Sequence, residues 1–324
     1  MNILNDIRKP VESELDIFEK HFHNNLKSDV PFLNIILNYI IRTKGKRIRP
    51  LLTFLSAKIF GEINSSTYTA ATFIELLHTA TLIHDDIVDE SFERRGKFSI
   101  NAIWKSKVAV LVGDYFLSRG LLLAVKEEQY NMLETISEAV KAMSEGELIQ
   151  MQSAYKSNID IEKYFEIIDK KTASLFKACV VCGAQSVGVS EEDFQKISLF
   201  GSIIGIAFQI KDDIFDYENK GIIGKPIKND IKDKKLTLPL ILALNNSTYS
   251  SKKEIIRLIN NHNNNKVKVQ YIIDFVKSNK GIELSYDYLN NYKNKAFSIL
   301  DTLPSNEANT SMKKLVEYII SRKS

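Results

Sequence analysis

Residues 69–89 read TAATFIELLHTATLIHDDIVD, and in this stretch an apolar helical pattern runs directly into a cluster of acids. The pattern repeats with the period of an α-helix rather than that of a strand, so it predicts one long helix. Asp85, Asp86 and Asp89 then lie near the carboxyl end of that helix, where the helix dipole disfavours negative charge. The stretch therefore predicts a helical scaffold whose acidic end needs a positive partner.

The acidic motif occurs twice in the sequence. DDIVD at 85–89 recurs as DDIFD at 212–216, and each copy closes an apolar helical segment. Residues i and i+4 share a helix face about 5.4 Å apart, so the first and last aspartates of each motif point the same way, whereas the middle one lies about 100° around the helix. One copy alone would fit a solvated acidic helix end, but two nearly identical copies favour a common chemical role.

These carboxylates are hard oxygen donors with no histidine or cysteine motif beside them. Such donors select Mg²⁺, Ca²⁺ or Mn²⁺, and Mg²⁺ is usually held by one or two carboxylates together with substrate phosphates. The sequence therefore predicts that metal ions are the positive partner and that they bring a phosphate with them. The candidate metal ligands are Asp85, Asp86, Asp89, Asp212, Asp213 and Asp216.

Helical periodicity dominates the rest of the sequence. Only 13 Gly and 6 Pro occur among 324 residues, and alternating strand patterns are scarce. We predict an all-α, single-domain helical bundle over residues 1–324, with a central active-site cavity that both acidic helix ends face, since bundle sites are built from facing helices. The predicted helices span residues 3–24, 31–41, 48–60, 66–89, 100–104, 108–125, 129–153, 161–186, 192–217, 236–244, 251–258, 268–277, 282–302 and 310–322.

Composition narrows the possible classes of function. The formal net charge of +4 is too small to indicate a nucleic-acid-binding protein, and no RNA or DNA module motif is visible. The charged N-terminus lacks the apolar core of a signal peptide. No apolar run approaches the roughly 18 residues of a membrane span. We therefore expect a soluble, cytoplasmic protein without a nucleic-acid partner.

Two further motifs have chemical interpretations that the sequence does not favour. Cys179 and Cys182 form a CxxC pair, but a zinc site would need more ligands nearby, so the apolar flanks favour two small core residues. ELLH at 75–78 has the Glu-x-x-His spacing of di-iron bundles, which require two such motifs and two further Glu. Only one such motif is present, so a di-iron site is rejected.

Basic residues gather near both acidic motifs. RTKGKRIRP at 42–50 places five cations around Gly45, and Arg94 and Arg95 follow the first motif. Lysine binds phosphate as a point charge and arginine as a fork, although each basic group alone would also fit a solvated turn. A site with metal ions and this many cations suits at least two polyanions. The donors near the second motif are Lys171, Thr172, Gln209, Lys225 and Lys235.

With these motifs in place, nearly the whole chain resembles the trans-prenyltransferases, the family of all-trans polyprenyl diphosphate synthases. The motifs that carry the resemblance, in the family's order, are GKRIRP, LLHTATLIHDDIVDESFERRG, VLVGDYFLSRG, EGELIQM, KTASLF, FQIKDDIFDY and GKPIKNDIKDKKLTLPLI. The resemblance implies that an allylic diphosphate, held by Mg²⁺, ionises to a carbocation that the double bond of isopentenyl diphosphate attacks. Loss of a proton then gives an allylic product one isoprene unit longer.

The resemblance also implies roles for individual residues. It assigns Mg²⁺ to Asp85, Asp89 and Asp212, with Asp86, Asp213 and Asp216 in support. The residues expected to grip the allylic diphosphate are Arg94, Lys171, Lys225 and Lys235. Those expected to grip isopentenyl diphosphate are Lys46, Arg49, His78 and Arg95. The side chains placed to steady the cation are Gln209 and Thr172, so that Lys171, Thr172 and Gln209 form the catalytic set.

Small side chains one turn before Asp85 predict a long product. Ala80 and Thr81 lie there, followed by Leu77 on the next turn and Phe116 on the facing helix. A bulky aromatic at Ala80 or Thr81 would form a floor after a short chain, because an isoprene unit is about as long as one helical turn, about 5 Å. The open turn predicts a product beyond about twenty carbons, and family likeness favours about thirty to forty, as in quinone side chains.

Several rival functions can be compared with these motifs. A geranylgeranyl or farnesyl diphosphate synthase would use the same residues for a shorter product. A class I terpene cyclase or head-to-head condensing enzyme is disfavoured by the second complete acidic motif and by GKRIRP. A regulatory subunit of a two-component synthase should lack some of these acids or cations. Family likeness implies a homodimer, and an apolar product suggests a peripheral membrane contact during release.

Overall fold

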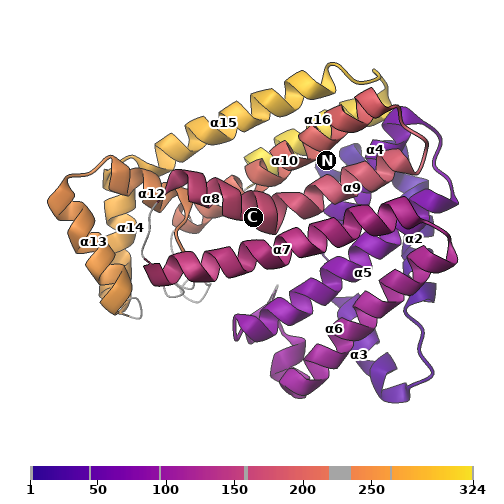
Figure 1. Cartoon of the computed structure of the whole chain (residues 1–324), viewed down its shortest axis with the longest axis horizontal. Helices are drawn as coiled ribbons and strands as arrows, with labels where there is room; N and C mark the ends of the chain where they lie inside the picture. Colours follow the sequence, from indigo (N-terminus) through magenta and orange to yellow (C-terminus); the bar gives the residue numbers. More distant parts are fainter. Residues whose placement is uncertain are drawn as a thin grey trace. The chain divides into compact units, whose positions relative to one another are not determined.

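The computed structural model describes residues 3–43, 45–94, 96–156, 160–218, 235–262 and 265–322 of the chain. Across these ranges the secondary structure is helical apart from one two-stranded hairpin (Figure 1). The predicted all-α fold class is therefore confirmed. The described chain divides into two compact units, and the predictions of one domain and of one shared cavity stay predictions.

Each unit is built from separate stretches of the chain. The first unit comprises Met1–Ser137, Ala178–Ser198 and Leu303–Met312; the second comprises Glu138–Lys177, Leu199–Thr302 and Lys313–Ser324. The elements wholly in the first unit are α1 (Ile3–Arg8), the 3-10 turn η1 (Lys9–Val11), α2 (Glu12–Asn25), α3 (Pro31–Arg42), α4 (Ile48–Phe60), α5 (Ser65–Val88), β1 (Glu93–Arg94), β2 (Lys97–Phe98) and α6 (Ile100–Lys126).

The remaining elements belong to the second unit or contribute residues to both. Those wholly in the second unit are α8 (Ile161–Ile168), the π turn η2 (Asp169–Ala173), α12 (Leu238–Asn245), α13 (Tyr249–His262), α14 (Lys266–Ser278) and α15 (Gly281–Leu300). Those that contribute to both units are α7 (Tyr130–Lys156), α9 (Ser174–Gln185), α10 (Glu191–Glu218) and α16 (Glu307–Ser321).

Both ends of α5, which carries the first acidic motif, are fixed by local hydrogen bonds. At the start, the Asn64 side chain accepts from the Thr67 amide at 3.3 Å, and the Thr67 hydroxyl accepts in return from the Asn64 amide. This capping box satisfies amides that a helix leaves unpaired. At the other end, Glu90 adopts a left-handed conformation (φ 48°), and the Ser91 amide donates to the Asp86 carbonyl at 2.9 Å. The helix therefore stops directly after its aspartates.

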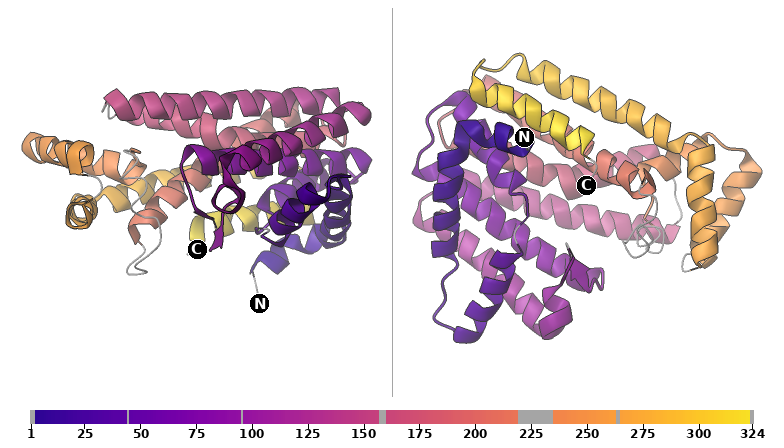
Figure 2. Two further views of the ribbon diagram at one scale, coloured as in Figure 1. Left: turned by 90° about the horizontal axis from the view of Figure 1, so that it is seen from below. Right: turned by 180° about the vertical axis from the view of Figure 1, so that it is seen from behind.

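α6 packs along α5 in the first unit (Figures 1 and 2). A Cβ atom at Gly120 would lie 2.5 Å from the Phe73 ring, and one at Gly113 would overlap the His84 imidazole, so both glycines permit the close approach. By length and composition, α6 is also the one helix in the described ranges that could cross a membrane, which corrects the expectation that no apolar segment approaches that length. Only 39% of its most apolar window is buried, and Leu111 is 68% exposed.

Local chemistry changes several predicted helix boundaries. Pro10 lies in the 3-10 turn η1, which divides the helix predicted over 3–24 into α1 and α2, because proline lacks an amide hydrogen and disrupts a helix interior. The break predicted between the helices over 100–104 and 108–125 is confirmed, because the two segments of α6 meet at a kink where the backbone of Lys105 is non-helical. The helix predicted over 161–186 contains the π turn η2, and the β1–β2 hairpin follows the first motif where only a helix break was predicted.

The CxxC pair lies in the interior of the first unit, on α9. Cys179 and Cys182 are free thiols, and both are fully buried. The helix approaches α4 so closely that a Cβ at Gly183 would overlap the Thr53 carbonyl. Burial raises the pKa of Cys179 to about 12 and raises that of Cys182 as well. Both side chains therefore stay protonated near neutral pH and behave as small core residues.

The second unit places the π turn η2 between two glycines. A Cβ at Gly146 of α7 would lie 2.8 Å from the Lys171 amide nitrogen, and one at Gly205 of α10 would lie 2.5 Å from the Ala173 Cα. These glycines let both helices approach the backbone of the turn, which is wider than an α-helical turn and is a feature often found at functional sites. On other elements of the same unit, the side chains of α12, α13 and α14 form a hydrophobic cluster with Tyr217 of α10.

Candidate active site

The three aspartates of the first acidic motif differ in exposure. Asp86 is only 4% exposed, whereas Asp85 is half-buried and Asp89 is exposed. Arg94, from β1, donates from Nε to Asp86 Oδ1 at 2.7 Å. Burial raises the pKa of Asp86, and the charge and hydrogen bond of Arg94 oppose that rise. The middle aspartate thus faces a protein cation, while the outer two are more accessible to a ligand.

A pocket lies beside this motif within the first unit. Tyr39, His78 and Arg94 line it together with the middle aspartate of the motif. The Tyr39 hydroxyl donates to the Phe98 carbonyl at 2.7 Å, and its ring meets the Trp104 ring edge to face at 5.4 Å. The structure therefore brings together two residues predicted to bind diphosphate, His78 from α5 and Arg94 from the hairpin.

Arg47 fixes the basic loop that precedes α4. Its backbone is left-handed (φ 53°), its Nε donates to Glu19 at 3.0 Å, and its guanidinium also pairs with Glu75. Burial alone would lower the pKa of Arg47, but the two carboxylates raise it. Arg47 is therefore held inward by ion pairs, and its neighbours Lys46 and Arg49 are the cations of this loop predicted to bind isopentenyl diphosphate. Glu75, which belongs to ELLH, has the role of an ion-pair partner.

In the second acidic motif the first aspartate contacts the end of the chain. Arg322, which follows α16, donates from Nη2 to Asp212 Oδ1, and its guanidinium lies 4.0 Å from the centre of the Phe208 ring. All three residues belong to the second unit. Asp212 and Asp216 are half-buried. A protein cation therefore occupies one oxygen of an aspartate predicted to bind metal.

The middle aspartate of this motif is again turned inward. Asp213 is 5% exposed and accepts hydrogen bonds from the Tyr164 hydroxyl at 2.8 Å and from Gln209 Nε2 at 2.9 Å. Burial raises the pKa of Tyr164 well above its usual range, and the Asp213 charge raises it further, so the hydroxyl remains a donor. The two motifs share this division between a buried middle aspartate and more exposed outer ones.

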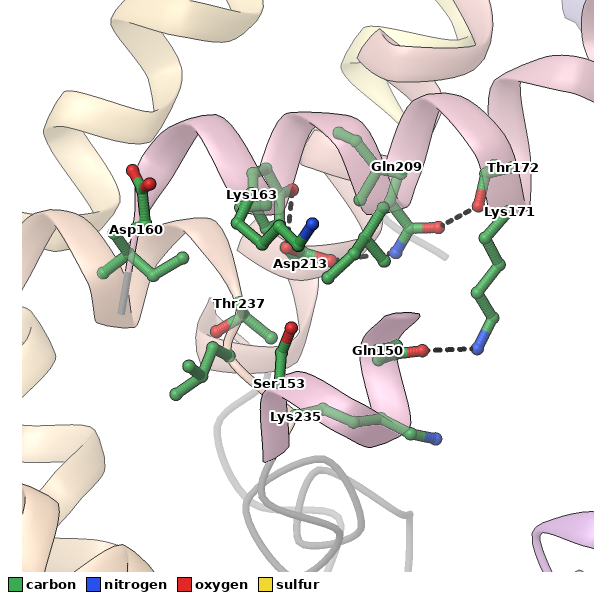
Figure 3. Close-up of a pocket in the computed structure, with 15 residues that line it drawn as sticks. Gln150, Ser153, Asp160, Lys163, Lys171, Thr172, Gln209, Asp213, Lys235 and Thr237 are labelled. Atoms are coloured by element: carbon green, nitrogen blue, oxygen red, sulfur yellow. Dashed lines mark hydrogen bonds between the residues drawn. The ribbon is translucent and has the colours of Figure 1, made fainter. Parts of the chain in front are cut away.

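A second pocket lies beside this motif, and the predicted catalytic set lines it (Figure 3). The Thr172 hydroxyl donates to Gln209 Oε1 at 2.8 Å. The Lys171 ammonium donates to Gln150 Oε1 at 2.7 Å and pairs with Glu147, both on α7. Lys235, predicted to bind the allylic diphosphate, lines the same pocket. An anion entering this pocket would find three lysines, Lys163, Lys171 and Lys235, and the Thr172 hydroxyl.

The residues predicted to shape a product tunnel lie in the α5–α6 region of the first unit. Ala80 is 2% exposed, and Leu77 and Phe116 are buried. Thr81 is half-buried, and its hydroxyl donates to the His78 carbonyl at 3.0 Å. A larger side chain at Ala80 would therefore have to enter packed space. Their role in product length stays a prediction.

Two predicted diphosphate ligands, Arg95 and Lys225, lie outside the described residues. Conversely, sequence reasoning missed three residues that contact the predicted site. Glu147 had a signal, because it belongs to the motif EGELIQM. Tyr164 and Arg322 had none, since their partners lie 49 and 110 residues away in the sequence.

The donor set fits Mg²⁺ that arrives with a diphosphate. Within the described ranges, no three His, Cys, Asp or Glu side chains converge to form a complete metal site. Mg²⁺ does not require one, because it usually takes one or two carboxylates and completes its shell with water and substrate phosphates. The outer aspartates supply oxygen only and are the more exposed members of each motif. They could therefore hold the ion from one side while phosphate oxygens bind it from the other.

Comparison with protein families and solved structures gives concordant matches. The family model for polyprenyl synthetase matches residues 30–276. The chain is 34% identical to an octaprenyl diphosphate synthase of Escherichia coli (strain K12) over 280 residues, which cover 86% of each protein.

Two solved structures are also similar over nearly the whole chain. A polyprenyl synthase from Caulobacter crescentus CB15, complexed with calcium and isoprenyl diphosphate, has a TM-score of 0.92 and 30% identity, and the match covers 99% of this chain and 98% of that one. A geranylgeranyl pyrophosphate synthase from Bacteroides thetaiotaomicron has a TM-score of 0.86 and 35% identity, with 99% and 100% covered.

Proposed function

We propose that this chain, which belongs to the polyprenyl synthetase family, is a long-chain all-trans polyprenyl diphosphate synthase. It is a prenyltransferase, and the proposed reaction condenses isopentenyl diphosphate with an allylic diphosphate. The observation that carries the proposal is the pairing of each acidic motif with a pocket that also holds basic side chains. Each such pocket has what a diphosphate and its metal ion require.

Mg²⁺ is the proposed cofactor, held by Asp85, Asp89 and Asp212 with Asp86, Asp213 and Asp216 in support. When bound, it supplies charge stabilisation for the leaving diphosphate. The similar Caulobacter structure was solved with calcium and isoprenyl diphosphate, which supports a divalent cation beside this class of ligand. The cofactor and the individual ligands rest on family likeness and on the chemistry of the donors.

The chain's own residues divide the work between two diphosphates. The allylic diphosphate would be bound by Lys171, Lys235, Arg94 and Lys225. Isopentenyl diphosphate would be bound by His78, Lys46, Arg49 and Arg95. Gln209 and Thr172 present oxygen atoms that would steady the allylic cation. The departing diphosphate is the proposed proton acceptor, so no side-chain base is required.

The proposed product has about thirty to forty carbons, a length suited to quinone side chains, because the positions five and four residues before Asp85 carry the small side chains Ala80 and Thr81 and each isoprene unit extends about 5 Å. A geranylgeranyl diphosphate synthase is the second candidate, favoured by the similarity to the Bacteroides enzyme of that name. The two candidates share their chemistry and differ only in where elongation stops.

The test is to incubate the purified protein with Mg²⁺, farnesyl diphosphate and excess isopentenyl diphosphate, and to size the dephosphorylated products by mass spectrometry. A ladder that ends at thirty to forty carbons supports the long-chain proposal, and a stop at twenty supports the second candidate. Cyclic hydrocarbons without extension would instead indicate a terpene cyclase.

Ala80→Phe tests the predicted tunnel in the same assay. The aromatic ring should shorten the product by at least one isoprene unit, because Ala80 is a small, buried residue about one turn before Asp85. Val267→Phe, at a 78% exposed position of α14, is the control and should leave the ladder unchanged. An unchanged ladder from Ala80→Phe would refute the tunnel assignment.

We also propose that the protein is a cytoplasmic homodimer that contacts membranes only to release its product. The exposed apolar side chains of α6, including Leu111, Leu122 and Val125, support an interface with a second copy. Flotation with liposomes during turnover tests the membrane contact. The protein should float with the liposomes while it elongates substrate and should not do so in the absence of substrate.

A further inference from the structure

Asp213 has protein donors on both carboxylate oxygens. Oδ2 accepts from the Tyr164 hydroxyl at 2.8 Å and from the Leu238 amide at 3.0 Å, and Oδ1 accepts from Gln209 Nε2 at 2.9 Å. These donors come from three elements of the second unit: α8, the start of α12, and α10 itself. The side chain is 5% exposed. Its lone pairs are thus directed at the protein rather than at solvent.

The hydrogen bonds continue from Asp213 to the π turn. Gln209 donates from Nε2 to Asp213, and its Oε1 accepts from the Thr172 hydroxyl at 2.8 Å (Figure 3). An ionised carboxylate only accepts hydrogen bonds, so it selects the NH₂ end of the Gln209 amide. The oxygen end is thereby left for Thr172. The charge on Asp213 therefore fixes which way the Gln209 side chain presents its two ends.

Asp213 also holds the start of α12. Thr237 stands at the N-cap position of that helix but makes no capping hydrogen bond with its side chain. Asp213 takes the Leu238 amide instead, where the helix dipole favours a negative charge. A second contact, 2.8 Å between the hydroxyls of Tyr217 and Thr237, joins α10 to the same point. The segment with Lys235 leads directly into this anchored helix start and lines the pocket.

We propose that Asp213 is a positioning residue, not a metal ligand: it orients the Gln209 amide and anchors the segment that carries Lys235. The inference rests on the proposed function, because it assigns these residues to the prenyl transfer site. Tyr164 is the second member of this assembly, since its buried hydroxyl holds Asp213 from α8. The adjacent Asp212 has a different environment, half-buried and in contact with Arg322.

Asp213→Asn is the most informative substitution because it keeps the shape of the side chain. If the Asn oxygen retains Tyr164 and Leu238, its NH₂ group faces the NH₂ group of Gln209, and the Gln209 amide must turn over. We expect kcat to fall about tenfold to a hundredfold, since misplacement of a positioned group by about 1 Å has effects of that size. The Mg²⁺ concentration for half-maximal rate and the KM for isopentenyl diphosphate should stay within about twofold of wild type. Tyr164→Phe should change kcat in the same direction, by less.

Two controls separate positioning from metal binding and from general damage. Asp212→Asn should raise the half-saturating Mg²⁺ concentration by at least about tenfold, because it removes a proposed metal ligand. Tyr292→Phe removes a hydroxyl from a half-buried neighbour of α8 that stacks on Phe165 at 5.9 Å. It should leave kcat, KM and Mg²⁺ dependence unchanged.

Three further readouts do not depend on turnover. Hydrogen exchange of the peptide 235–245 should accelerate in Asp213→Asn and not in Asp212→Asn, because only the first replaces the charged acceptor of the Leu238 amide with a neutral one. Mg²⁺ binding, measured by calorimetry with an allylic thiodiphosphate that cannot ionise readily, should weaken only in Asp212→Asn. The double variant Asp213→Asn/Gln209→Glu places a carboxylate acceptor at position 209 opposite the NH₂ donor at position 213. It should therefore recover part of any loss in Tm.

These measurements test the role of Asp213 independently of the proposed prenyl transfer activity. If Asp213→Asn weakens Mg²⁺ binding as much as Asp212→Asn does, Asp213 is a metal ligand and the proposal is wrong. Wild-type kcat with unchanged exchange of the peptide 235–245 would also overturn it. If the wild-type protein does not elongate farnesyl diphosphate, the proposed function fails first, and the exchange and Mg²⁺ measurements still show whether Asp213 anchors α12.

Discussion

Lys105 has the backbone conformation of a glycine. Its φ of 72° and ψ of 163° interrupt α6 at a residue that carries a side chain. That region of conformational space is nearly restricted to glycine and strains other residues by about 1–3 kcal/mol. Nothing in the local sequence predicts a strained residue, since the helices predicted over 100–104 and 108–125 indicate only that a break lies between them.

Lys105→Gly should therefore stabilise the protein. The strain released exceeds the added backbone entropy of about 0.5–1 kcal/mol, so the free energy of unfolding should rise by about 1 kcal/mol. Urea denaturation measures the change. The matched control is Ser106→Gly, at a helical position, which should lower the free energy of unfolding by about 0.5–1 kcal/mol. Equal destabilisation by both variants would contradict the assignment of strain.

Arg322 should compete with a metal ion for Asp212. The contact joins two partly exposed side chains, so its free energy is at most about 1 kcal/mol. Arg322→Ala should accordingly increase the affinity for Mn²⁺ in the absence of substrate by about threefold, as measured by electron paramagnetic resonance. Arg322→Lys keeps the charge and should stay close to wild type. Weaker Mn²⁺ binding in Arg322→Ala would show that the arginine assists the metal instead.

At the residue scale, the sequence predicted what depends on helix geometry alone. The middle aspartate of each motif lies about 100° away from its neighbour by the helical repeat, and in the structure Asp86 and Asp213 are the buried members. The partners that hold them could not be predicted in the same way. Tyr164 reaches Asp213 across 49 residues of sequence, and such contacts follow from tertiary packing.

Among the elements, the π turn η2 is the one whose geometry depends most on its neighbours. Its sequence, DKKTA, continues a helical pattern, and the helix predicted over 161–186 passes through it without a break. The sequence of the turn itself does not indicate its extra residue. The turn is recognised in the structure, where Gly146 and Gly205 permit two other helices to approach its backbone. Helix periodicity is a local signal, so it located the helix and missed the change in its winding.

Gly205→Ala should damage activity more than stability. The new Cβ would lie 2.5 Å from the Ala173 Cα, so the turn that carries Lys171 and Thr172 must shift. Overpacking of this kind costs about 1–3 kcal/mol, and the displaced groups should lower kcat by at least about tenfold. Thermal unfolding and product assays measure the two effects. Ser202→Ala, on the same helix, should affect neither, and wild-type kcat in Gly205→Ala would show that the turn tolerates movement.

For the molecule as a whole, the apolar face of α6 predicts self-association. Leu111 is 68% exposed, and Leu122 and Val125 lie on the same side of the helix. Leu111→Glu should convert a species of about twice the 36.9 kDa chain mass into one of the chain mass, because a charge would be buried without a partner. Sedimentation velocity over a range of concentrations checks this. Tyr249→Glu, at an 83% exposed position at the start of α13, should leave the mass unchanged.

The fold class and the family could be predicted from sequence because both rest on signals repeated along the chain: helical periodicity and several motifs in order. The membrane-length apolar character of α6 was missed because its apolar residues are interrupted by polar ones such as Asp114, so no uninterrupted run appears. Average hydropathy over a helix and the length of a run are different properties. The proposed product length depends on where the predicted tunnel ends rather than on any motif.

The chain contains one tryptophan, Trp104, and its ring meets that of Tyr39, which lines the pocket of the first unit. Its fluorescence therefore originates at a single known place. A molecule that enters this pocket and displaces Tyr39 would change the surroundings of the indole, and hence the colour and intensity of the emitted light. The protein thus carries its own optical reporter for occupancy of that pocket, with no dye attached and no reaction required.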